Sequence, residues 1–288
     1  MHKVALHPRS SVAITSYLSN PAHALALIAP LGMGKTYVAN HIASALLSIS
    51  PKDISNYPYV LYLLPDEKNS IKIEPVRSAI STLKLKTTGE KNIRRVIIIE
   101  HAETMTTEAQ NALLKSLEEP PQDTVILLTI SNESLVLPTI LSRVQKITLH
   151  QPDTASVAAH FNDVPNDTLD KILLLSDGKP GLTRALLDDD TNHPLVAGIR
   201  VAKELLGADA FTKLCKIDDI VKAKHAQIIT DALVYIAQAT LARSSSAANK
   251  DTLERWHSVL EAAYTAQQQL ARNGQQKLVL TNLFLRIS

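Results

Sequence analysis

The sequence predicts an α/β protein in which a parallel sheet with crossover helices fills the first half of the chain and helices fill the rest. Three observations predict this class. Short apolar runs rich in β-branched residues alternate with helical patterns up to about residue 150. The runs are almost continuously apolar, as expected of strands that helices cover on both faces. After residue 150 this strand pattern disappears.

Five short runs are the candidate strands, and together they predict a five-stranded parallel sheet. They are ALALI (24–28), YVLYLL (59–64), RVIIIE (95–100), TVILLTI (124–130) and KITL (146–149).

Two helices between these strands can be predicted in some detail. In TYVANHIASALL the side chains of Val38, Ile42, Ala45 and Leu46 recur on one helical face. In MTTEAQNALLKSLEEPP, Thr107 and Gln110 have the spacing of a capping box, and a proline pair at 120–121 ends the helix.

The second half of the chain reads as helices throughout. Residues 151–192 predict two or three short helices, interrupted by Pro165 and by the turn at 178–181. From residue 193 helical patterns continue to the end, and the Ser-rich stretch 243–251 separates two long helices. We therefore expect three domains, over residues 1–150, 151–192 and 193–288.

Composition sets limits on function. The 288 residues suffice for two or three modules, and a formal charge of +2 without a Lys/Arg run argues against a dedicated nucleic-acid arm. The single Cys215 excludes an internal disulfide and a cysteine-based zinc site, as is typical of a cytoplasmic protein. No apolar run reaches the roughly 18 residues of a membrane span, so we expect a cytoplasmic protein.

The stretch APLGMGKT (29–36) is a phosphate-binding loop in all but its first position. It follows a strand and opens a helix, as such loops do. Gly32 and Gly34 allow backbone N–H groups to turn toward phosphate oxygens. Lys35 brings positive charge to the β- and γ-phosphates, and Thr36 offers a hydroxyl to Mg²⁺. The pattern predicts a site for ATP or ADP with Mg²⁺.

The departure is Ala29, which stands where the motif has its first glycine. Its methyl group either crowds the loop or is tolerated there. Three interpretations stay open: a working nucleotide site, a chance match of GMGKT, and inherited architecture that no longer needs to be filled.

In a working phosphate-loop ATPase a second strand ends in an Asp that holds Mg²⁺, followed by a Glu that activates water. The region to examine is residues 94–149, with RRVIIIEHAE, NALLKSLEEPP and LPTILSR. This region resembles the AAA+ clamp-loader subunits of bacterial DNA polymerase III, the delta-prime subunits and their gamma/tau relatives. The resemblance covers residues 1–190 well, and the helical last third fits only in kind.

The resemblance places Glu100 at the magnesium position and His101 at the catalytic glutamate. Glu100 keeps a carboxylate on a longer stem, so it can still hold Mg²⁺. His101 supplies no carboxylate beside the metal, and we interpret it as a non-catalytic replacement, although histidine can act as a base. An alternative, in which Glu103 is the displaced carboxylate, is disfavoured because it lies beyond the strand end.

Arg143 in LSRV matches the family's Ser-Arg-Cys motif, whose arginine acts in the nucleotide site of the neighbouring subunit. Such an arginine stabilises charge on the γ-phosphate and can accelerate transfer by about 10³–10⁵. The alternative for Arg143 is a local salt bridge. Thr129 takes the position of a sensor of the γ-phosphate, with Ser131 as its rival. Arg184 resembles a lid arginine that contacts nucleotide, or is an ordinary solvated helix residue.

The resemblance implies an AAA+ domain, a helical lid and a helical collar in a pentameric ring with gamma/tau and delta subunits. The ring would load a sliding clamp at primer–template DNA. We expect no ATPase activity from this chain alone and no zinc, because SISPKDISNYP has no cysteine where relatives insert a zinc module. Two alternatives stay open: a hydrolysing gamma/tau-type ATPase, and an AAA+ switch protein unrelated to replication.

Overall fold

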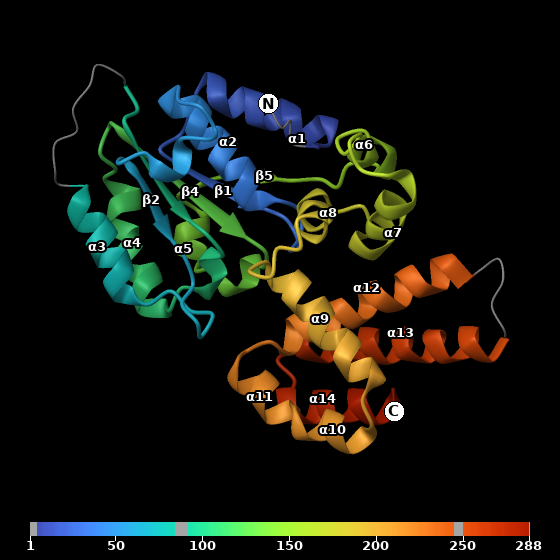
Figure 1. Ribbon diagram of the computed structural model, residues 1–288. Coiled ribbons are helices and arrows are strands. Elements are labelled where there is room, and N and C mark those ends of the chain that lie inside the picture. The colour runs from blue at the N-terminus through green and yellow to red at the C-terminus, as the bar shows by residue number, and fades with distance from the viewer. Residues whose placement is uncertain (1–4, 84–91, 245–249, 288) are drawn as a thin grey trace. The chain divides into compact units, whose positions relative to one another are not determined.

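A computed structural model describes residues 5–83, 92–244 and 250–287 of the chain. The chain forms two compact units, residues 1–152 and 153–288. The first unit contains the sheet and the second contains helices, coloured blue to green and yellow to red in Figure 1.

The first unit is built on one five-stranded sheet in the order β2-β3-β4-β1-β5, with every neighbouring pair parallel. This confirms the predicted α/β class and the five strands. The strands are β1 (Ala24–Ile28), β2 (Val60–Leu63), β3 (Arg95–Ile99), β4 (Thr124–Ile130) and β5 (Gln145–Thr148). β4 lies between β1 and β3, so the carboxyl ends of these three strands meet at one edge. The phosphate loop leaves the sheet at that edge.

Helices cover both faces of this sheet, as the continuously apolar strands predict. Alternate strand residues enter two separate cores, for example Leu25 and Leu27 on one face and Ala24 and Ala26 on the other. The core containing Leu25 is closed by α1 (Pro8–Ser19) and α2 (Lys35–Leu47). The opposite core is closed by α3 (Ile73–Thr82), α4 (Thr107–Glu118) and α5 (Pro138–Leu141). Short 3-10 turns η1 (Ile54–Asn56), η2 (Ala102–Thr104) and η3 (Glu133–Leu135) connect these elements.

The buried face of α2 differs from the predicted one. Val38 and Ile42 are buried as expected, but Ala45 is exposed and Leu46 is only half-buried. The helix packs against both the sheet and α1, so its buried stripe is wide and shifted. The buried residues of its apolar stripe are Val38, Ala39, Ile42, Ala43 and Leu47.

The N-terminus of α4 also differs from the prediction by one residue. Thr106, not Thr107, is the N-cap, and its hydroxyl accepts a hydrogen bond from the N–H of Ala109 at 3.3 Å. Gln110 does not complete a capping box. Its buried amide donates to the carbonyls of Met105 and Leu135, both at 3.1 Å, and accepts from the N–H of Leu137 at 2.7 Å. The side chain of Gln110, which the local sequence pattern assigned to the helix cap, therefore makes tertiary contacts instead.

The regular elements within the described residues of the second unit are all helices, joined by turns and short loops. Three helices precede residue 192: α6 (Thr154–Ala158), α7 (Asn166–Ser176) and α8 (Pro180–Leu187). They are followed by α9 (Pro194–Gly207), α10 (Ala210–Cys215), α11 (Ile217–Lys222), α12 (Ala226–Ser244), α13 (Lys250–Ala271) and α14 (Gln276–Arg286). α12 packs against α7, α9 and α13. The predicted boundary between a lid and a collar at residue 192 stays a prediction.

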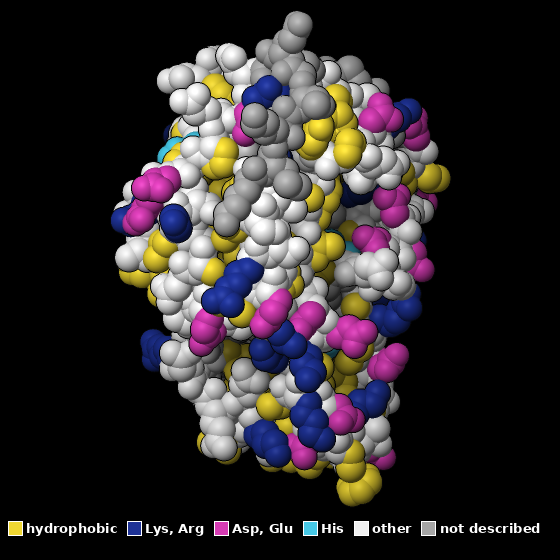
Figure 2. Space-filling view, turned by 90° about the vertical axis from the view of Figure 1, so that its left-hand side faces the viewer, with side chains coloured by type: hydrophobic (Ala, Val, Ile, Leu, Met, Phe, Trp, Pro, Cys, Tyr) yellow, Lys and Arg dark blue, Asp and Glu magenta, His cyan; other side chains and the backbone are white. Residues whose placement is uncertain are grey.

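Charge is mixed over the face of the molecule that Figure 2 draws. On the face drawn in Figure 2, basic and acidic side chains lie interspersed and form no large patch of one sign. This matches the small formal charge of +2. No helix among the described residues has the length and apolar character to cross a membrane.

Candidate nucleotide site and surface arginine

The phosphate loop has the backbone conformation that its glycines predict. Gly32 and Gly34 have φ angles of 87° and 79°, in the left-handed region that side chains rarely adopt. Gly34 is the N-cap of α2, so the loop leads directly into the positive end of that helix. Ala29 is buried in the core between the sheet, α1 and α2. Its methyl group is therefore tolerated, and the loop keeps the shape of an anion site.

Lys35 lies within the loop rather than in solvent. Only 5% of its surface is exposed, and its Nζ donates to the carbonyl oxygens of Ala29 at 2.8 Å and Pro30 at 3.1 Å. Burial lowers the pKa of Lys35 to about 8, and the nearby carboxylate of Glu103 only partly opposes this change. The ammonium group is thus desolvated and directed at the loop, close to where the motif places the phosphates.

Thr36 and Glu100 meet directly. The Thr36 hydroxyl donates to Oε2 of Glu100 at 2.8 Å, joining the first turn of α2 to the end of β3. One hydroxyl and one carboxylate are oxygen donors of the kind Mg²⁺ prefers, and Mg²⁺ retains several waters beside a small number of protein ligands. The longer stem of Glu100 therefore does not keep its carboxylate from Thr36. No group of three or more His, Cys, Asp or Glu side chains suited to a metal ion occurs within residues 5–83, 92–244 and 250–287.

His101, at the end of β3, has an unusual backbone conformation. Its φ of 51° is left-handed, which is uncommon for a residue with a side chain. Its N–H donates to Oγ1 of Thr129 at 2.9 Å, so the fully buried Thr129 is joined to the acidic strand end. The rival sensor position, Ser131, has a buried Oγ with no hydrogen-bond partner among the described residues.

The sequence pattern did not predict that the side chain of Glu103 lies next to the end of β3. Glu103 lies beyond the strand, but η2 folds back, and its side chain is only 9% exposed, with Oε1 at 3.4 Å from Nδ1 of His101. Burial raises the pKa of Glu103. Hydrogen bonds from His101 and from the N–H groups of Glu103 and Ser131 lower it by more than burial raises it, so the net change is downward. Glu103 is therefore a buried carboxylate that pairs with His101 and lies near enough to Lys35 for its charge to act on the pKa of that lysine. The left-handed turn that brings it there has no clear signal in the sequence.

Arg143 lies at the surface, just after α5. Its Nη2 forms an ion pair with Oε1 of Glu118 at 2.8 Å, and its Nη1 donates to the carbonyl of Thr139 at 2.9 Å and to Oγ of Ser142 at 3.3 Å. The local salt bridge considered for this residue is thus present. Among the described residues Arg143 forms no hydrogen bond or ion pair with its own phosphate loop.

Arg184 belongs to the second unit, where it lies on α8. Its Nε donates to Oδ2 of Asp188 at 2.7 Å, an exposed pair one helical turn apart. The pair is of the kind expected for an ordinary helix arginine. The role of Arg184 at the nucleotide stays a prediction.

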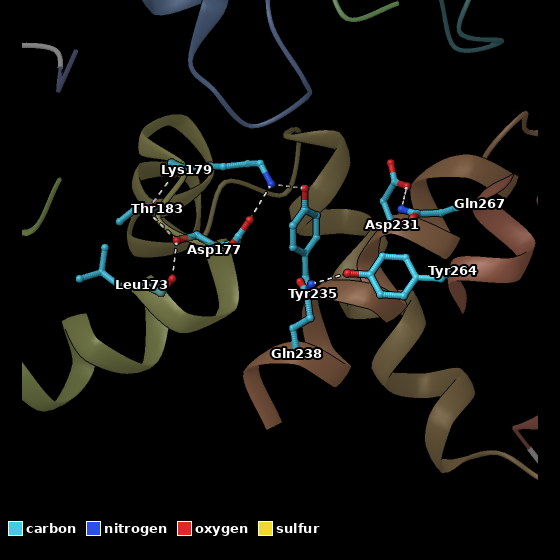
Figure 3. A network of polar contacts seen from close by, with 10 residues as sticks. Leu173, Asp177, Lys179, Thr183, Asp231, Tyr235, Gln238, Tyr264 and Gln267 are labelled. Carbon is cyan, nitrogen blue, oxygen red and sulfur yellow. Dashed lines mark hydrogen bonds and ion pairs between the residues drawn. The ribbon is translucent and has the colours of Figure 1, made fainter. Parts of the chain in front are cut away.

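Lys179, in the turn just before α8, is a buried basic residue. Lys179, the N-cap residue of α8, donates to the hydroxyl of Tyr235 at 2.8 Å and pairs with Asp177 at 3.3 Å (Figure 3). Its Nζ also lies 4.5 Å from the centre of the Tyr235 ring. The contact joins the turn before α8 to α12.

Asp231 extends this polar region of the second unit. Its Oδ1 accepts from the side-chain amides of Gln267 at 2.6 Å and Gln227 at 2.8 Å, which links α12 to α13. Burial raises the pKa of Asp231, although the two amides and Lys179 oppose this change. These contacts join α8, α12 and α13 by polar groups as well as by apolar packing.

Comparison with known proteins identifies the family of the first unit. A family model described as DNA polymerase III, delta subunit, matches residues 16–153. A DNA polymerase III subunit delta' of Pseudomonas aeruginosa is 32% identical over 204 residues, which are 64% of this chain and 62% of that protein. Residues 16–153 belong to the delta-prime clamp-loader family. The delta-prime subunit of Yersinia pestis is 30% identical over 210 residues, which are 69% of this chain and 61% of that protein.

The alignments to these two delta-prime relatives therefore span slightly over three fifths of the relatives' length. A solved structure of a DNA polymerase III gamma subunit-related protein from Thermotoga maritima superposes with a TM-score of 0.50. It is 17% identical and covers 97% of this chain and 98% of its own. This likeness concerns the fold, which is that of AAA+ proteins with a phosphate loop.

Proposed function

We propose that the chain is a delta-prime-like subunit of a bacterial clamp loader that lends Arg143 to the nucleotide site of a neighbouring subunit. The neighbours would be gamma/tau and delta subunits in a pentameric ring, and the ring would use ATP to load a sliding clamp at primer–template DNA. The second unit would supply the lid and the collar through which the subunits assemble. The similarity of residues 16–153 to delta-prime subunits supports this assembly.

The observation that carries the proposal is the position of Arg143. Its guanidinium is held at the surface by Glu118 and Thr139, and it forms no hydrogen bond or ion pair with its own phosphate loop among the described residues. An arginine intended for its own nucleotide would be expected near Lys35 and Thr36. A guanidinium at the surface can instead meet a phosphate bound to another chain, where it stabilises the charge of the transition state.

The chain's own site suits binding better than turnover. The left-handed glycines, the desolvated Lys35 and the Thr36–Glu100 contact support binding of ATP or ADP, with Thr36 and Glu100 as the candidate Mg²⁺ ligands. Mg²⁺ would supply charge neutralisation for the phosphates when bound. His101 stands where the family has its water-activating glutamate, and its Nδ1 is engaged by Glu103. We therefore expect bound nucleotide to persist rather than to be split.

Steady-state hydrolysis by the isolated chain tests this part of the proposal. We expect ATP to bind in a titration and the hydrolysis rate to stay at the level of a Lys35→Ala variant. Turnover that disappears in Lys35→Ala would instead establish a hydrolysing subunit of the gamma/tau type. Glu103 is the feature that favours this rival, because it keeps a buried carboxylate close to Lys35. In that case Glu103→Gln should abolish the turnover as well.

A further inference from the structure

We propose that Glu118 is a positioning residue that holds Arg143 ready for the phosphate of the neighbouring subunit. This inference rests on the proposed function, because it concerns how the arginine is presented. The contact itself is an ion pair of 2.8 Å between Oε1 of Glu118 and Nη2 of Arg143. Glu118 is the last residue of α4, and Arg143 follows α5, so the pair joins two elements that are separate in sequence.

The position of Glu118 is not explained by the stability of its own helix. A carboxylate in the last turn faces the negative end of the helix dipole, which is unfavourable. The pair is also exposed, with 36% of the Arg143 side chain and 51% of the Glu118 side chain accessible to solvent. Exposed ion pairs contribute little to folding. The contact is therefore better explained by what it does to the conformation of Arg143.

The contacts leave part of the guanidinium available. Nη1 is occupied by Thr139 and Ser142 and Nη2 by Glu118, whereas Nε has no hydrogen-bond partner among the described residues. A guanidinium carries five N–H donors, so donors remain for a phosphate without release of Glu118. A free arginine side chain loses much rotamer entropy when it is fixed at a phosphate. Glu118 and Thr139 fix it in advance.

Glu118 and Thr139, the two residues that fix Arg143, belong to a rigid part of the first unit. Gln110, two turns before Glu118 on α4, binds the backbone of Leu135 and Leu137 just ahead of α5. α4 and α5 also pack against each other in the core. Movement of Glu118 relative to the backbone of Arg143 is thereby restricted, which a positioning contact requires.

The test is a variant series in the clamp-loader complex reconstituted with its gamma/tau and delta partners, the sliding clamp and primed DNA. Glu118→Ala should lower the kcat for ATP by about two- to fivefold, the size expected from loss of one exposed ion pair. The KM for ATP, the assembly of the complex and the melting temperature should be unchanged. Glu118→Gln keeps an oxygen that accepts from Nη2 and should restore most of the rate.

Two controls separate positioning from general effects. Glu119→Ala removes the same charge one residue further on, where the side chain is exposed, and should leave kcat unchanged. Glu118→Ala added to Arg143→Ala should slow the complex no further, because Glu118 acts through Arg143. An unchanged or higher kcat in Glu118→Ala, with Arg143→Ala still impaired, would overturn this inference alone. If Arg143→Ala itself leaves kcat unchanged, the proposed function fails instead.

Discussion

Lys35 illustrates how a single residue of a phosphate loop differs from an ordinary surface lysine. Its ammonium group is buried and held by two carbonyls of the loop, so its positive charge is poorly solvated. A phosphate arriving at the loop would offer that charge a better partner than the carbonyls do. The same residue makes nucleotide affinity depend on pH, because burial lowers its pKa to about 8.

We expect ATP to bind the isolated chain less tightly as pH rises above about 8. Only the ammonium form of Lys35 attracts phosphate, and in the nucleotide-free protein that form is mostly present at pH 7 and mostly lost at pH 9.5. Above the pKa, binding requires uptake of a proton, so Kd should approach a tenfold increase per pH unit, about 1.4 kcal/mol. Titrations from pH 7 to 9.5 measure this. Lys35→Met should bind weakly with no such slope, and a flat wild-type profile would contradict the assignment.

At the scale of elements, two helices each carry a polar side chain, buried in one case and half-buried in the other, that joins separate parts of its own unit. On α4, Gln110 binds three backbone groups around the start of α5. On α12, Tyr235 accepts from the buried Lys179 at the start of α8. Each of these side chains is costly to remove, because the groups that it satisfies would stay buried without partners.

Gln110→Leu should destabilise the first unit by about 2–4 kcal/mol. The apolar side chain fills similar space but leaves two carbonyls and one N–H without their partner. Urea unfolding of the whole chain, with a probe in the first unit, measures the free energy of unfolding. Gln145→Leu, at an exposed position of β5, is the matched control and should change it little. Equal stability of the two variants would mean that solvent replaces the Gln110 contacts.

Tyr235→Phe should destabilise the second unit by about 1–3 kcal/mol. The substitution removes only the hydroxyl that accepts from the buried ammonium of Lys179. Tyr264→Phe is the control. The hydroxyl of Tyr264 also accepts a hydrogen bond, from Gln238 at 2.6 Å, but Tyr264 is 41% exposed. Thermal unfolding followed by circular dichroism compares the two. A Tyr264→Phe effect as large as that of Tyr235→Phe would show that burial of Lys179 is not the cause.

The sequence predicted the fold of the first unit well, and the site in part. Five apolar runs became the five parallel strands because alternate side chains enter two cores, a pattern that is local in sequence. The glycines of the loop were equally readable, since their left-handed conformation restricts the residue type. The contacts of Glu103, Gln110 and Glu118 could not be predicted from the sequence. The charge of Lys35 and the N–H of Ser131 reach Glu103 from other elements, Gln110 binds the backbone ahead of α5, and Glu118 pairs with Arg143. Each of these partners is brought close only by folding.

At the scale of the whole molecule, two separate places on the first unit would perform two different tasks. The loop with Lys35 and Thr36 would hold a nucleotide for the subunit itself. Arg143, held by Glu118, would act on the nucleotide of a neighbour. A subunit of this kind would contribute to catalysis in the proposed ring without turnover of its own.

The most direct test compares Arg143→Ala and Lys35→Ala, each placed in this chain only, within the reconstituted complex loaded with clamp and primed DNA. We predict that Arg143→Ala lowers the ATPase rate while the complex still assembles, as size-exclusion chromatography would show. We also predict that Lys35→Ala leaves the rate nearly unchanged. The reverse pattern, in which Lys35→Ala slows the complex and Arg143→Ala does not, would contradict the central claim.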